Sequence, residues 1–137
     1  MAPVEWTSAD LVFSRQLDSD HRKLFEQLEK VRLAVECAAP ANQLNFRLWR
    51  LSKDLSIHFN SEERLMRDSR YPARQWHQRQ HDAGRHKMAR LMEAAHGRGG
   101  LNAALEEFAG WMKDHVRLAD RMFAAHLRND QRERLAS

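Results

Sequence analysis

The chain has 137 residues, which is about the size of one domain. Its residues are 42% hydrophobic and 31% charged, so the chain can form one sizeable core and keep a polar surface. Five Gly and three Pro favour long regular elements, and the many Leu, Ala, Arg, Glu and Met residues favour helix. No apolar run approaches the roughly 20 residues of a membrane span, which excludes a membrane-spanning protein.

The net charge of +4 comes from 23 Lys and Arg against 19 Asp and Glu. The basic residues are scattered over all the predicted helices, so we expect a solvated basic surface and no nucleic-acid partner. The single cysteine, Cys37, excludes a disulfide within the chain and favours a reducing compartment. The N-terminus lacks a basic and apolar leader, so the expected location is the cytoplasm.

Turn and capping residues divide the chain into an arm over residues 1–17 and helices at about residues 18–38, 42–68, 72–95 and 101–118. Asp18, Ser19 and Asp20 can cap the first helix. The bundle is expected to extend to about residue 127, followed by a short tail to residue 137. Because the connections are short, consecutive helices become antiparallel neighbours. The sequence therefore predicts a single all-α domain, an up-down-up-down four-helix bundle with an N-terminal arm.

Polar side chains interrupt the apolar stripes of the four helices. Residues three or four apart share one helix face, and this face is apolar except at His21, His58, Glu62, His77, His81 and His115. Burying one polar group without a partner costs about 1–3 kcal/mol. Six such groups need a shared explanation, and a metal site supplies one because imidazole and carboxylate are common ligands.

These polar positions lie at the start of the first helix, the end of the second, the start of the third and the end of the fourth. In an up-down-up-down bundle all four locations meet at one end. Two pairs, His58 with Glu62 and His77 with His81, have the i, i+4 spacing that places both side chains on one face. The pattern therefore predicts one metal site at that end.

Asp120 requires a change in helix phase. It follows His115 by five residues, which is about 140° around an ideal helix. Val116, Asp120, Phe123 and Leu127 nevertheless form their own apolar-spaced series, shifted by one residue. We therefore infer a π-bulge, or the end of the helix, between His115 and Asp120.

The chain from Trp6 to about Leu127 resembles the hemerythrin family. The matching pieces are Trp6, Asp18-Ser-Asp-His21, His58-Phe-Asn-Ser-Glu62-Glu63-Arg-Leu-Met66, Tyr71-Pro72, His77 with His81, and Trp111-Met-Lys-Asp-His115 followed by Asp120. Every ligand position of the family pattern is present.

The resemblance implies a non-haem di-iron centre. One iron would be held by His77, His81 and His115, and the other by His21 and His58. Glu62 and Asp120 would bridge the two irons together with an oxo or hydroxo group. The second iron would keep one open position, where members of the family bind O2 reversibly.

The donor types agree with this implication. Thiolate ligands are absent, which disfavours a zinc finger or an iron–sulfur cluster. Five imidazoles and two carboxylates should favour the ferrous state, so an O2 binder is preferred over an oxidase. The pocket over the open position should be dry and apolar, and its expected lining is Leu24, Leu28, Phe59 and Met112.

Three functions remain open from the sequence. The first is a protein that binds O2 reversibly for carriage, storage or delivery. The second is a sensor in which O2 or the iron redox state changes contacts with a protein partner, which the sequence leaves unknown. The third is a di-iron enzyme with peroxidase or NO-handling activity, although no obvious set of proton donors supports it. A monomer or weak oligomer is expected in each case.

Overall fold

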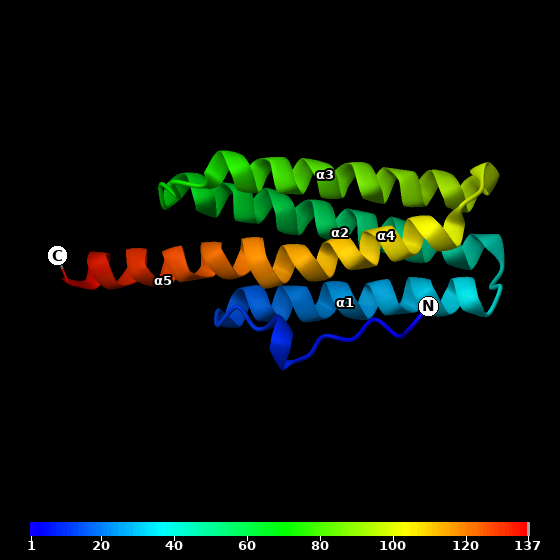
Figure 1. Cartoon of the computed structure of the whole chain (residues 1–137), viewed down its shortest axis with the longest axis horizontal. Coiled ribbons are helices and arrows are strands. Elements are labelled where there is room, and N and C mark those ends of the chain that lie inside the picture. The colour runs from blue at the N-terminus through cyan, green and yellow to red at the C-terminus, as the bar shows by residue number, and fades with distance from the viewer. Residues whose placement is uncertain (137) are drawn as a thin grey trace.

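Four long helices lie side by side in the computed structural model, which describes residues 1–136 (Figure 1). The first three are α1 (Arg15–Glu36), α2 (Ala41–Asp68) and α3 (Arg74–Glu93), and a short π-helical segment, η2 (Ala94–Arg98), ends the third. The fourth consists of α4 (Leu101–His115), η3 (Val116–Asp120) and α5 (Arg121–Ala136). Strands are absent from the described residues. The predicted all-α up-down-up-down bundle with an N-terminal arm is confirmed.

The core lies where the apolar stripes of the four helices meet. Large side chains fill it, and the fully buried ones include Phe25, Phe59, Phe108, Leu28, Leu48, Leu51, Leu91 and Leu105. Helical spacing after His58 and Glu62 predicts Leu65 as the last core position of α2. This prediction is wrong, because Leu65 is 41% exposed and the next residue, Met66, is fully buried. None of the described helices combines the length and apolar character that a bilayer span requires.

The start of α1 differs from the prediction. Ser14 caps the helix, and its side chain accepts a hydrogen bond from the Leu17 N–H. Asp18, Ser19 and Asp20 therefore lie within the helix, and the arm ends three residues earlier than predicted. Asp18 instead accepts a hydrogen bond of 2.9 Å from the Val12 N–H, which holds the end of the arm against the first turn.

The fourth helix is much longer than predicted. We expected this helix to end near residue 118, the bundle to extend to about residue 127 and a tail to follow, but the helix continues through η3 and α5 to Ala136. In Figure 1 α5 extends beyond the end of α1. The segment from Val116 to Asp120 is a π-helical turn, so the predicted π-bulge is present. Ser137, the last residue of the predicted tail, lies outside the described residues.

The arm is fixed to the fourth helix through Asp10. This residue ends η1 (Ser8–Asp10), and its buried carboxylate accepts from the Thr7 N–H at 2.9 Å, from Lys113 Nζ at 2.8 Å and from Arg117 Nε at 2.7 Å. Burial alone would raise the pKa of Asp10, but the hydrogen bonds from Lys113, Thr7 and Arg117 lower it. Asp10 is therefore ionised at neutral pH and links residues more than 100 positions apart in the chain.

Helices α3 and α4 approach closely at Gly84. A methyl group at this buried position would overlap the six-membered ring of Trp111. Trp111 in turn stacks on His115, with ring centroids 4.7 Å apart and planes inclined by 16°. The absence of a side chain at Gly84 therefore sets the position of the ring that packs on His115.

Replacing Gly84 with Ala should destabilise the protein by about 1–3 kcal/mol, because the added methyl group forces the Trp111 ring to move. Gly110 provides a matched control, since a Cβ there meets no atom within 4 Å. Gly110→Ala should raise stability by up to about 1 kcal/mol through helix propensity alone. Urea unfolding followed by circular dichroism measures both changes. Equal effects of the two substitutions would contradict the packing argument.

Candidate metal centre

The structure brings seven polar side chains together at one end of the bundle, and all seven are buried. They are His21, His58, Glu62, His77, His81, His115 and Asp120, the residues singled out in the sequence. His58 is the most exposed of them at 7%. A polar cluster of this size in an otherwise apolar bundle is costly unless its members share a charged ligand.

Local helix geometry positions these side chains. The i, i+4 spacing places two polar groups on the inner face of α2 and two on the inner face of α3. His115 is the last residue of α4, and Asp120 ends the π-turn that follows. Because a π-turn holds one residue more than an α-turn, Asp120 lies above His115 rather than to its side.

The seven residues form two overlapping groups. One contains Glu62, His77, His81, His115 and Asp120, and the other contains His21, His58, Glu62 and Asp120. Within each group the potential ligand atoms lie within 4.8 Å of one another, which is close enough for them to surround one metal ion. Both carboxylates belong to both groups, so the arrangement has two metal-sized positions that share Glu62 and Asp120.

Each carboxylate directs one oxygen toward each group. Glu62 Oε1 lies 2.6 Å from His77 Nε2 and 3.4 Å from His81 Nε2. Its other oxygen, Oε2, lies 3.0 Å from His58 Nε2. A carboxylate placed in this way can bridge two metal ions.

Asp120 repeats the arrangement from the opposite side. Its Oδ1 atom lies 3.0 Å from both His77 Nε2 and His115 Nε2, and its Oδ2 atom lies 2.9 Å from His21 Nε2. The three-histidine group thus contacts one oxygen of each carboxylate, and the two-histidine group contacts the other.

None of the converging atoms makes a hydrogen bond within the described part of the chain. This holds for the Nε2 atoms of all five histidines and for both oxygens of Glu62 and of Asp120. Buried polar atoms are almost always hydrogen-bonded in folded proteins. These nine nitrogen and oxygen atoms point at one another, which fits a site for cations. A ligand set made only of nitrogen and oxygen suits a first-row transition metal.

Electrostatics in the cluster also favour bound positive charge. Burial alone would lower the pKa of His58 and His77, but the facing carboxylates raise it to about 10 and about 9. Burial and the charge of Asp120 would raise the pKa of Glu62, but the neighbouring imidazoles lower it well below its ordinary value. Without a metal ion, protons on the histidines therefore balance the two carboxylates.

Two carboxylates outside the cluster contact ligand-type histidines, and the sequence analysis did not identify them. Glu63 Oε2 lies 2.6 Å from His81 Nδ1, and Asp20 Oδ2 lies 3.4 Å from His58 Nδ1. Such contacts hold an imidazole ring so that its Nε2 atom faces the metal. Glu63 could have been expected from its position directly after Glu62, because this position directs the Glu63 side chain toward α3.

The four predicted lining residues Leu24, Leu28, Phe59 and Met112 are all buried in the main apolar core. Phe59 stacks on His81, with ring centroids 4.1 Å apart. Leu24 and His58 also line a surface hollow of about 580 Å³ between α1 and α2. This hollow is where the cluster comes closest to solvent.

Fold and cluster together define a helical-bundle protein with a buried cation-binding site. The chain belongs to the hemerythrin family, because the model of the hemerythrin HHE cation-binding domain matches residues 12–127. Comparison with curated proteins and with solved structures found no match.

Metal loading should release protons from the cluster. His58 and His77 have a raised pKa in the metal-free protein, so both carry a proton at pH 7 and must lose it before they bind a metal. Anaerobic titration with Fe²⁺ in weakly buffered solution with a pH indicator should show release of about two protons per chain from these rings. Release of less than one proton per chain at pH 7 would contradict this assignment.

Proposed function

We propose that the cluster holds two iron ions and binds O2 reversibly. His77, His81 and His115 would bind one ion, His21 and His58 the other, and Glu62 and Asp120 would bridge them. The single observation that carries the proposal is the division of each carboxylate between the two groups. Three histidines on one side and two on the other leave the two-histidine ion with one ligand fewer.

A ferrous pair bound there would supply one electron from each ion and an open position for O2. The side chains of the cluster set the net charge around the two ions. Five neutral imidazoles and two carboxylates leave two divalent cations only partly neutralised, and this residual positive charge favours the lower oxidation state. The donor set therefore supports reversible binding more than oxidation of a substrate.

Apolar side chains would keep water from the open position. Leu24, Leu28 and Met112 are buried in the core cluster. Apolar surroundings slow the release of charged species formed from bound O2. We propose that O2 enters through the hollow between α1 and α2, because Leu24 and His58 line it. Leu24 would then be the residue that separates solvent from the site.

One observation favours a sensor as the second candidate. His115 and Asp120 lie on the same continuous helix as α5, which extends beyond α1 (Figure 1). A shift of these two side chains on O2 binding would pass directly into α5 and could alter its contacts with a partner protein.

Iron content and reversible spectra test the proposal. Protein reduced without oxygen, loaded with Fe²⁺ and exposed to air should bind two iron ions per chain and develop a visible charge-transfer band that disappears under argon. Glu62→Gln should lower the iron content and abolish the reversible band, because one bridge is weakened. Glu106→Gln, an exposed position outside the cluster, should match the unaltered protein. Irreversible conversion to the ferric form in the unaltered protein would reject reversible binding.

Replacing Leu24 with Ala should accelerate oxidation to the ferric state several-fold, because water would reach the open position. The decay of the visible band in air measures this rate. Leu48→Ala is the matched control, since Leu48 is equally buried but lies about 15 Å along α2 from His58. Both substitutions remove the same core volume, so equal decay rates would show that stability rather than access controls oxidation.

A further inference from the structure

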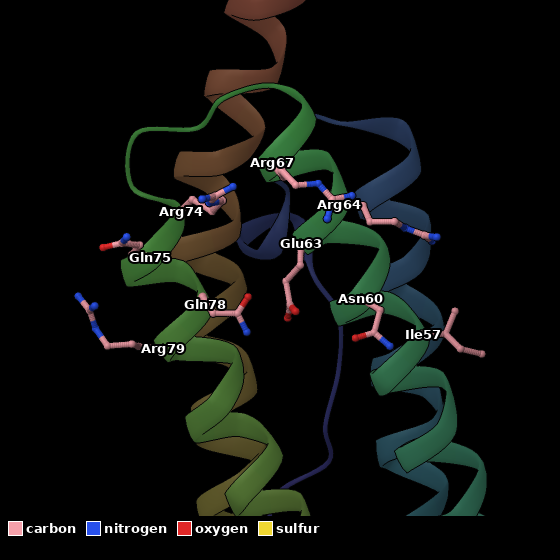
Figure 2. Close-up of a pocket in the computed structure, with 9 residues that line it drawn as sticks. All are labelled: Ile57, Asn60, Glu63, Arg64, Arg67, Arg74, Gln75, Gln78 and Arg79. Atoms are coloured by element: carbon pink, nitrogen blue, oxygen red, sulfur yellow. The ribbon is translucent and has the colours of Figure 1, made fainter.

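A basic groove runs along the surface between the C-terminal half of α2 and the first turns of α3 (Figure 2). Its volume is about 810 Å³, which is within the range of small-molecule sites. The lining residues are Ile57, Asn60, Glu63, Arg64, Arg67, Arg74, Gln75, Gln78 and Arg79. In Figure 2 the side chains of Glu63 and Gln78 point into the space between the two helices.

Four arginines give this groove a strong positive charge. Arg64 and Arg67 come from α2, and Arg74 and Arg79 come from α3, so both rims of the groove carry exposed basic residues. In Figure 2 the Arg64 and Arg79 side chains point outward, away from the space between the two helices. Arg67 contacts the exposed Asp68 at 3.6 Å, whereas the other three make no ion pair with any described residue. Because these exposed guanidinium groups have no strong competing partner, they can turn inward toward an anion bound between the two helices.

The start of α3 adds to this field. Ala73 precedes the helix without a side-chain cap, and the first turn contains no acidic residue. The Arg74 N–H donates to the Tyr71 carbonyl at 3.1 Å, and the remaining N–H groups of that turn carry partial positive charge at the edge of the groove. Glu63 is the only acidic residue in the lining, and Arg85 partly neutralises it through a hydrogen bond of 2.8 Å.

The composition of the lining narrows the class of ligand. No aromatic side chain lines the groove, so a nucleobase would have no stacking surface. Three amides, Asn60, Gln75 and Gln78, can bind hydroxyl groups, and Ile57 is the only apolar residue. A compact ligand with several charges and hydroxyl groups fits these features best.

We propose that the groove binds a small polyanion that carries two or more phosphate groups on a hydroxylated skeleton, such as a sugar bisphosphate. The arginines would bind the phosphates and the amides the hydroxyl groups. Glu63 lies at the floor and also contacts His81 Nδ1, so the bound anion would lie one side chain away from the metal cluster. The fold thus brings four of the scattered basic residues together around one groove.

Calorimetric titration of the iron-loaded full chain with fructose bisphosphate at low salt tests this site. The double variant Arg64→Gln/Arg74→Gln removes one unpaired charge from each wall and should weaken binding by about tenfold or more. The control Arg47→Gln/Arg132→Gln removes the same charge from exposed positions outside the groove and should change the Kd by less than about twofold.

Glu63→Gln provides a test in the opposite direction. It removes the single negative charge of the lining while keeping an oxygen for His81, so bisphosphate binding should tighten several-fold. Glu133→Gln, on the exposed part of α5, should leave the affinity unchanged. A gain in affinity cannot come from partial unfolding, and iron content measured on each sample detects any loss of metal.

Several outcomes would overturn the proposal. Four of them are no detectable binding by the unaltered protein, equal loss in the two arginine double variants, weaker binding by Glu63→Gln, and a tighter complex with a short DNA duplex than with the bisphosphate. The last outcome would identify the groove as a nucleic-acid surface. Tricarballylate, a smaller anion with a comparable negative charge, distinguishes phosphate recognition from general anion binding, and equal affinity for it would also reject the proposed class.

Discussion

The bundle has to compensate the negative charge of two buried carboxylates. Glu62 and Asp120 lie in the interior and both contact His77, and the charge of Asp120 opposes ionisation of Glu62. A buried pair of negative charges is unstable unless positive charge lies between or beside them. His58 and His77 supply this compensation as protonated rings in the metal-free protein, and all five histidines would supply it as ligands to cations. Protons and metal ions would therefore compete for the same nitrogen atoms.

The bundle fixes these atoms because each helix contributes at the same end. The remainder of every stripe is apolar, and the buried leucines and phenylalanines along it hold the helices in register. Aromatic rings then fix the imidazoles from the side. Phe59 stacks on His81 and Trp111 on His115, and Gly84 gives Trp111 the room it needs. The site is thus supported by packing as well as by charge.

Helix periodicity explains which features the sequence could predict. Spacing along a helix translates directly into a face, so the pairs on α2 and α3 and the phase shift before Asp120 were readable from residue positions. Whether the seven side chains bind metal is a separate question that the proposed iron titration addresses.

The features that were missed depend on contacts between helices. Glu63 and Asp20 lie beside the stripes, and their partners are on neighbouring helices. The groove arginines belong to two helices and do not form a run in the sequence. The start of α1 was misplaced because Ser14 and Asp18 are both good capping residues, and only the folded arm distinguishes them. The length of α5 had a signal, since neither Gly nor Pro follows Gly110.

The additional residue in the π-turn also changes what lies past the cluster. Because the turn at Val116–Asp120 shifts the helix by one position, Phe123 becomes fully buried and joins Met66 and Tyr71 in a second apolar cluster. Phe123 and Tyr71 lie with their rings 5.9 Å and 6.4 Å from that of His77. A single inserted residue therefore both turns an acid inward and closes the open end of the bundle with aromatic rings. The burial of these rings depends on helix phase, so deleting one residue from this turn would rotate Phe123 by about 100° around the helix and admit water to that end.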